Sequence, residues 1–295
     1  AISAIDIALW DIAGKVAGVP IYVLLGGKTR DRVRVYHAIY GDSPELLAEN
    51  ALQLMEEGYS AFKTSPVPSN WRELPWRQVL EMADERMRTI RDAIGDSPDL
   101  AVDFHVAIRE TSQALELARL ITPYKLMFIE EPARAEFIES SAKLRKNFRV
   151  ALATGENLYG VHRFTELLNA DAVDIIQPDL LCCGGFLEAK KIAAIAEAHY
   201  VTVAPHNPLG LISTAAGVHH SASINNFAIL EWHGDDKKKK SEFINESWVP
   251  KGGYFELPTD PGIGMTLNHD AIKANPPLNW DRGFASYSDG SPGFL

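Results

Sequence analysis

Polar residues stand at nearly even intervals along this chain, each at or just beyond the end of a short apolar run. The six positions are Asp103, Glu130, Glu156, Asp179, His206 and Glu231. Successive positions are 27, 26, 23, 27 and 25 residues apart, about the length of one strand, one helix and two loops. This spacing constrains the fold, because a barrel of repeated strand-helix units gathers the carboxyl ends of its strands at one mouth.

The apolar pattern predicts that strands and helices alternate. Eight strands are expected, at 33–38, 60–64, 100–104, 126–129, 150–153, 173–176, 201–204 and 227–230. Helices are expected at 1–16, 44–57, 76–94, 111–121, 135–148, 161–168, 186–200 and 211–222. Parallel strands need crossover helices, so eight such units can close into a barrel. An open doubly wound sheet is the rival, but no Gly-rich phosphate turn follows the first strand.

Bulk properties narrow the possible partners. The 295 residues include 29 basic and 39 acidic side chains, a net charge of −10, which disfavours nucleic acid and acidic membranes and favours small molecules. The two cysteines, Cys182 and Cys183, are neighbours. They provide no disulfide framework and fit a reducing cytoplasm. No apolar stretch approaches the roughly 20 residues of a membrane span.

Three carboxylates follow three consecutive predicted strands. Neighbouring strands lie about 4.8 Å apart, so Asp103, Glu130 and Glu156 are expected within reach of one ion. Crowded carboxylates repel one another unless a cation offsets their charge, and oxygen ligands suit Mg²⁺. A salt bridge at the rim is the better explanation of any one of them, but not of all three. The sequence therefore predicts a magnesium site.

The next two strand ends indicate a base. Asp179 and His206 follow adjacent strands, and a carboxylate on one imidazole nitrogen leaves the other nitrogen free to take a proton. His105 lies two residues after Asp103, on the same side of an extended strand, where it could act as a general acid. Glu231 at the last strand could donate to or orient a substrate oxygen.

Several segments carry a resemblance to a known family. They are Ala4-Ile-Asp-Ile-Ala-Leu-Trp-Asp-Ile-Ala-Gly-Lys, Leu24-Leu-Gly-Gly-Lys, Asp103-Phe-His, Phe128-Ile-Glu-Glu-Pro, Thr154-Gly-Glu-Asn, Gln177-Pro-Asp and Ala204-Pro-His-Asn-Pro. In this order, between about residues 3 and 270, they resemble the enolase superfamily. Within it, the chain is most similar to the mandelate racemase group and its acid-sugar dehydratases of the galactonate type.

The resemblance implies a TIM-like (β/α)7β barrel with Mg²⁺ on Asp103, Glu130 and Glu156, and Glu131 just outside the ligand set. It also implies an N-terminal α+β capping domain, most of which is expected to be absent from this chain. Residues 1–31 are then a junction segment with a residual capping-domain helix, 32–233 the catalytic barrel, and 234–295 a Gly- and Pro-rich tail packing on the barrel or the capping domain.

The reaction that the resemblance implies is dehydration of a sugar acid. His206, paired with Asp179, would remove the proton next to the carboxylate, and His105 would protonate the departing C3 hydroxyl, which gives a 2-keto-3-deoxy acid. Racemases of the group often carry Lys-x-Lys at the second strand, whereas this chain has Lys63-Thr64-Ser65. Lys63 is expected to bind the substrate carboxylate or a metal-bound oxygen.

A second departure leaves the substrate open. Galactonate enzymes usually continue Asp-x-His with Gly-Arg, whereas this chain has Val106-Ala107. A racemase or epimerase of a 2-hydroxy acid is the alternative on the same scaffold, and a non-catalytic barrel is a third hypothesis. Homo-oligomerisation is also expected.

Overall fold

The computed structural model describes residues 1–235, 239–277, 286–291 and 293, so parts of the predicted tail lie outside the described residues. The chain divides into two compact units. The first unit is Ala1–Tyr36, Gly155–Leu168 and Ile176–Trp280, and the second unit is His37–Thr154, Asn169–Ile175 and Asp281–Leu295. The predicted alternation of strands and helices is confirmed. No helix among the described residues is long and apolar enough to cross a bilayer.

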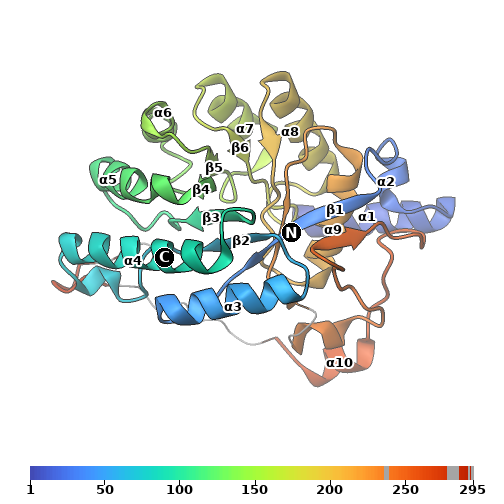
Figure 1. The fold of residues 1–295 in the computed structure, drawn as a ribbon. Coiled ribbons are helices and arrows are strands. Elements are labelled where there is room, and N and C mark those ends of the chain that lie inside the picture. The colour runs from blue at the N-terminus through green and yellow to red at the C-terminus, as the bar shows by residue number, and fades with distance from the viewer. Residues whose placement is uncertain (236–238, 278–285, 292, 294–295) are drawn as a thin grey trace. The chain divides into compact units, whose positions relative to one another are not determined.

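The second unit holds four neighbouring parallel strands. They are β2 (Ala61–Thr64), β3 (Asp99–Asp103), β4 (Leu126–Glu130) and β5 (Leu152–Thr154), and β2 also pairs with the end of β1 (Arg32–Ala38). The helices are α3 (Pro44–Glu56), α4 (Trp76–Ile94), α5 (Thr111–Ile121) and α6 (Ile138–Asn147), with short turns η1 (Trp71–Glu73) and η2 (Thr122–Tyr124). Figure 1 shows α3 to α6 along the outer side of these strands, so the helices cover that face.

Local sequence explains these helices. Ser43 caps α3, because its Oγ accepts a hydrogen bond from Leu46 N and Pro44 occupies the first helical turn. In α4 the buried apolar side chains recur every three or four residues, which is the period of one helix face. They are Val79, Ala83, Met87, Ile90 and Ile94. Both helices therefore pack one apolar face and leave the other in water.

The first unit contains the other strands. They are most of β1, the end of β6 (Ile175–Ile176), β7 (Thr202–Val203), β8 (Leu230–Trp232) and β9 (Tyr254–Glu256). Its helices are α1 (Ile2–Ala17), α2 (Ile21–Leu24), α7 (Gly160–Asn169, except its last residue), α8 (Phe186–Ala198), α9 (Leu211–Ser223) and α10 (His269–Ala274), with the turn η4 (Lys239–Phe243). β8 lies next to β1, and β9 pairs antiparallel with β1. Phe255 of β9 packs edge to face on Trp232 with ring centroids 5.2 Å apart.

The eighth strand lies further along the chain than predicted. Phe227 makes only an isolated bridge to Val203, whereas the strand is Leu230–Trp232. Glu231 is therefore inside the strand rather than after it. Side chains alternate across a strand, so a glutamate can face one side while its two apolar neighbours face the other. The apolar pattern alone placed the end of the strand two residues too early.

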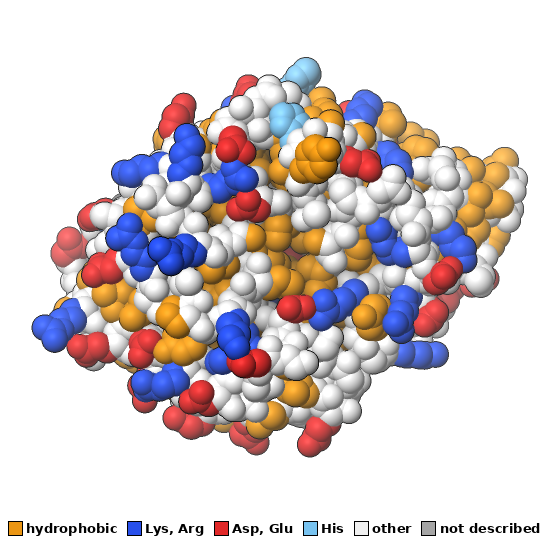
Figure 2. All heavy atoms as spheres, turned by 45° about the horizontal axis from the view of Figure 1, so that its top comes forward, with side chains coloured by type: hydrophobic (Ala, Val, Ile, Leu, Met, Phe, Trp, Pro, Cys, Tyr) orange, Lys and Arg blue, Asp and Glu red, His pale blue; other side chains and the backbone are white. Residues whose placement is uncertain are grey.

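Helix α1 matches its predicted bounds within one residue, but its apolar residues are exposed. Ile2 is 77%, Ile5 61%, Leu9 59%, Ile12 56% and Val16 84% exposed. Figure 2 shows this apolar surface at the right of the view. The opposite face of α1 makes polar contacts: Asp6 accepts a hydrogen bond from Phe186 N, and Asp11 from Ile263 N.

Candidate active site

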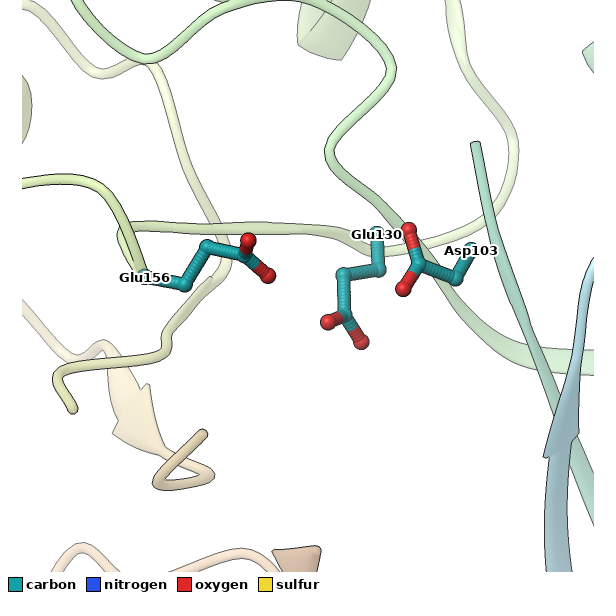
Figure 3. Close-up of side chains that lie close together, drawn as sticks. All are labelled: Asp103, Glu130 and Glu156. Atoms are coloured by element: carbon teal, nitrogen blue, oxygen red, sulfur yellow. The ribbon is translucent and has the colours of Figure 1, made fainter. Parts of the chain in front are cut away.

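Two carboxylates of the second unit lie side by side where β3 and β4 end. The strand register aligns Asp103 with Glu130, and both side chains are buried. Figure 3 shows the side chains of this pair next to each other. The structure thus brings together two of the three predicted ligands within one unit.

Lys63 of β2 contacts both of these carboxylates. Its Nζ donates to both oxygens of Glu130 at 2.8 Å and lies 3.5 Å from Asp103 Oδ2. All three residues are at most 5% exposed. Buried carboxylates need a positive charge or hydrogen bonds nearby, and the ammonium group supplies both. Lys63 is therefore part of this cluster, and its predicted contact with a substrate carboxylate stays a prediction.

His105 does not continue the extended strand as expected. It lies in a turn after β3 with φ at 51°, and its N–H donates to Asp103 Oδ1 at 2.7 Å. The imidazole Nε2 is 3.1 Å from Asp103 Oδ2, and the side chain is 61% exposed. The turn, and not strand periodicity, brings His105 beside Asp103.

Glu131 connects the ends of three strands. It is buried, and its Oε1 accepts a hydrogen bond from Thr154 Oγ1 of β5 at 2.6 Å. Its backbone N–H donates to Ala153 O, and its carbonyl accepts from Val106 N. The sequence indicated Glu131 as a neighbour of the ligands, whereas Thr154 was only part of the Thr154-Gly-Glu-Asn segment and had no predicted role.

In the first unit, His206 and Asp179 form the predicted pair. His206 Nδ1 lies 2.8 Å from Asp179 Oδ2. The other oxygen of Asp179 accepts a hydrogen bond from Leu181 N at 2.7 Å, and Asp179 is buried. This second hydrogen bond holds the carboxylate toward the imidazole, as in sites where an acid orients a catalytic histidine.

The second nitrogen of His206 faces two further carboxylates. His206 Nε2 is 3.4 Å from Glu156 Oε2 and 4.0 Å from Glu231 Oε2. Burial disfavours the charged imidazole, but the hydrogen bond to Asp179 and the charges of Glu231, Glu156 and Asp179 outweigh it. Together they raise the pKa of His206 to about 10.

Glu231 is held in place from two sides. Its Oε2 accepts a hydrogen bond from Asn207 N at 2.7 Å, and its Oε1 lies 3.1 Å from His233 Nε2. His233 was missed from the sequence, although it lies two residues after Glu231 on the same side of the strand direction. The alternation of side chains was the signal that could have found it.

Other reactive side chains do not form a competing site. Burial raises the pKa of Cys182 to about 11 and that of Cys183 to about 12, which leaves both as thiols at neutral pH. Burial also lowers the pKa of both His219 and His220 to about 4. His219 Nδ1 accepts from Tyr22 N and its Nε2 donates to Ile263 O. These hydrogen bonds give His219 a structural role.

Carboxylates and a His–Asp pair at the ends of helix-covered parallel strands are typical of α/β barrel enzymes. Comparisons with known sequences and structures are consistent with this class. The sequence model of the family described as enolase C-terminal domain-like matches residues 46–271, and that of the mandelate racemase and muconate lactonizing enzyme N-terminal domain matches residues 1–26. The chain belongs to this enolase-like mandelate racemase and muconate lactonizing enzyme family, and the predicted TIM-like fold class is confirmed.

Curated relatives cover nearly the whole chain. D-galactonate dehydratase of Xanthomonas oryzae pv. oryzae is 35% identical over 99% of this chain and 78% of its own length. D-galactonate dehydratase of Ralstonia pickettii is 34% identical over the same two fractions. An Agrobacterium radiobacter enolase with Na and L-malate bound, for which galactarate dehydration has been suggested, is 36% identical with a TM-score of 0.90, over 97% of this chain and 77% of that one.

Proposed function

We propose that this protein is a Mg²⁺-dependent dehydratase of sugar acids, with an aldonate such as galactonate or a related acid as its substrate. The observation that carries the proposal is the His206–Asp179 contact at 2.8 Å, with the remaining imidazole nitrogen facing Glu156 and Glu231. The relatives named D-galactonate dehydratase support the choice of reaction.

The donor set fits a hard divalent cation. Asp103, Glu130 and Glu156 are carboxylates that could act as metal ligands, and such oxygens suit Mg²⁺. Lys63 Nζ lies near Asp103 and Glu130, and its positive charge offsets the charge of these two carboxylates. A cation bound to the same carboxylates would have the same electrostatic effect. When bound there, the cation would supply positive charge that stabilises the negative charge developing on the substrate carboxylate.

His206 is the proposed base. Because Asp179 accepts the hydrogen bond from Nδ1, the proton that the imidazolium loses first is the one on Nε2, and a cation held by Glu156 would lower the pKa of His206 by offsetting one of the charges that raise it. The C2–H bond breaks, its proton moves to Nε2, and its electron pair moves toward the substrate carboxylate. Glu231, held by Asn207 N, is proposed to orient a substrate oxygen.

His105 is the proposed acid. Its exposed imidazole would give a proton to the C3 hydroxyl as the C3–O bond breaks, so that water leaves. As water leaves, the electron pair returns to form the C2–C3 double bond of an enol. The enol then takes up a proton at C3 and loses the proton of its C2 hydroxyl, which gives a 2-keto-3-deoxy acid. Lys63 is proposed to bind the substrate carboxylate by its ammonium group.

A substrate screen tests the proposal. The purified protein with Mg²⁺ is incubated with a panel of aldonic and aldaric acids, and 2-keto-3-deoxy acids are measured. Release from at least one aldonate is expected. Exchange and inversion at C2 without loss of water would favour a racemase or epimerase, and no reaction with any acid of the panel would overturn the proposal.

A further inference from the structure

A lysine of β2 lies on the same face of the sheet as the carboxylates that end β3 and β4. The strand register pairs Lys63 with Ala101 of β3, and it pairs Asp103, two positions further along β3, with Glu130 of β4. Because side chains alternate across a strand, all four side chains point to one side. In this register the residue between the lysine and the carboxylates is Ala101, whose methyl group leaves room for the lysine side chain.

The ammonium group of Lys63 is bound mainly to Glu130. Its Nζ donates to Oε1 and Oε2, both at 2.8 Å, and lies 3.5 Å from Asp103 Oδ2. Asp103 also accepts a hydrogen bond from His105 N. The side chains of the lysine and of both carboxylates are buried. Charges removed from water interact strongly, because little solvent screens them, so the two carboxylates depend on this ammonium group for charge compensation.

A divalent cation on Glu130 would lie close to the same ammonium group. Mg²⁺ binds carboxylate oxygens at about 2.1 Å, and each oxygen of Glu130 is 2.8 Å from Lys63 Nζ. While this contact persists, a cation bound to either oxygen lies no more than about 5 Å from Nζ, on whichever side of the oxygen it binds. Like charges at this distance repel strongly in a buried site. Cation and ammonium therefore stabilise the same carboxylates and destabilise each other.

We propose that Lys63 is a built-in counter-ion, which stabilises the Asp103–Glu130 pair before a divalent cation binds and lowers the affinity of the pair for that cation. The two carboxylates then have their arrangement before the cation arrives, and the bound cation remains exchangeable. The proposal deepens the function proposed above and rests on its cation site. It gives Lys63 a part in cation affinity that is separate from any contact with substrate.

Lys63→Met tests the proposal, because it removes the charge and keeps an unbranched side chain. Without Mg²⁺ we expect a lower Tm, since two buried carboxylates lose their shared counter-ion. With saturating Mg²⁺ we expect most of this loss to be recovered, because the cation supplies the missing charge. The Kd for Mg²⁺, measured by isothermal titration calorimetry at pH 8.5 to keep the carboxylates ionised, should be about 5- to 150-fold lower than in wild type.

Lys28→Met is the matched control. Lys28 Nζ also lies 2.8 Å from a carboxylate oxygen, Asp31 Oδ1, but both of these side chains are exposed. Exposed ion pairs contribute little, because water and salt screen them. The control should therefore keep the wild-type Tm and the wild-type Kd for Mg²⁺. An effect confined to Lys63→Met then belongs to the buried cluster and not to the loss of any lysine.

A Lys63→Met protein that does not fold without Mg²⁺ still decides the question. The proposal predicts that such a protein folds when Mg²⁺ is added, because the cation takes over the role of the ammonium group. Circular dichroism with and without Mg²⁺ measures this. A variant that stays unfolded at a Mg²⁺ concentration that saturates wild type would overturn the proposal.

The other outcomes separate this proposal from the proposed function. An unchanged or higher Kd for Mg²⁺ in Lys63→Met would overturn the role of Lys63, as would a loss of Tm that Mg²⁺ does not recover. Absence of Mg²⁺ binding by wild type would overturn both the cation site and this role. If wild type binds Mg²⁺ but dehydrates no sugar acid, the proposed function fails, while the two Kd values still decide the role of Lys63.

Discussion

His206 Nδ1 lies 2.8 Å from Asp179 Oδ2, so the carboxylate can accept a hydrogen bond from Nδ1 while Nε2 faces Glu156 and Glu231. The carboxylate is itself held by Leu181 N. This relation fixes both the tautomer and the direction of the ring. The first prediction follows from it.

Asp179→Asn should lower kcat by about 10²–10⁴-fold, because the amide can donate to Nδ1 and so favours the tautomer that protonates Nε2. The pKa of His206 should also fall, since one of the groups that raise it is removed. Steady-state kinetics on the substrate found in the screen measure the first effect, and NMR titration of the imidazole measures the second. Asp171→Asn, at an exposed aspartate, is the control and should retain wild-type kcat.

His105→Asn should separate the two halves of the reaction. Without the acid, loss of the C3 hydroxyl should slow by about 10²–10⁴-fold, while His206 can still exchange the C2 proton. In D₂O, mass spectrometry should detect deuterium in recovered substrate with little keto acid formed. Equal loss of exchange and dehydration would contradict the separate roles, and His206→Asn, which should lose both, is the reference.

Added Mg²⁺ should stabilise the protein against unfolding. A ligand that binds only the folded state at 100 times its Kd adds about 2.7 kcal/mol to the free energy of unfolding. Glu130→Gln should reduce this gain, because it removes a proposed charged ligand next to Asp103. Denaturation with and without Mg²⁺ measures the effect, and a full gain in the variant would exclude Glu130 as a ligand.

Two buried histidines should make the protein sensitive to acid. Burial lowers the pKa of His219 to about 4 from the ordinary value of 6.5, so the folded state favours the neutral ring. The contribution of the neutral His219 to the free energy of unfolding is fully present above pH 6.5 and is lost as the pH falls toward 4. At pH 5 the titration of this histidine should have lowered the free energy of unfolding by about 2 kcal/mol.

His219→Gln should remove that part of the pH dependence, since glutamine does not titrate. His220, whose pKa is also lowered to about 4, should continue to contribute a similar slope. Urea denaturation at pH 7 and pH 5 measures both effects. An unchanged difference between the two pH values in the variant would show that His219 is not responsible.

Some helices could be predicted with their bounds from the sequence. The bounds of α4 and α5, Trp76–Ile94 and Thr111–Ile121, agree with the prediction, because a regular apolar period over many residues reflects burial of one helix face. The predicted bounds of the late strands were less accurate. β6 and β7 are two residues long, and such short ladders depend on neighbouring strands that lie far away in the sequence.

The sequence by itself determined the order of strands and helices and the residue types at the strand ends, since both depend on local periodicity and on which positions are polar. Only the tertiary structure decided that Lys63 lies between Asp103 and Glu130, that His105 lies in a strained turn, and that His206 has a raised pKa. These properties depend on distances between distant residues, or on contacts that hold a backbone against its local preference.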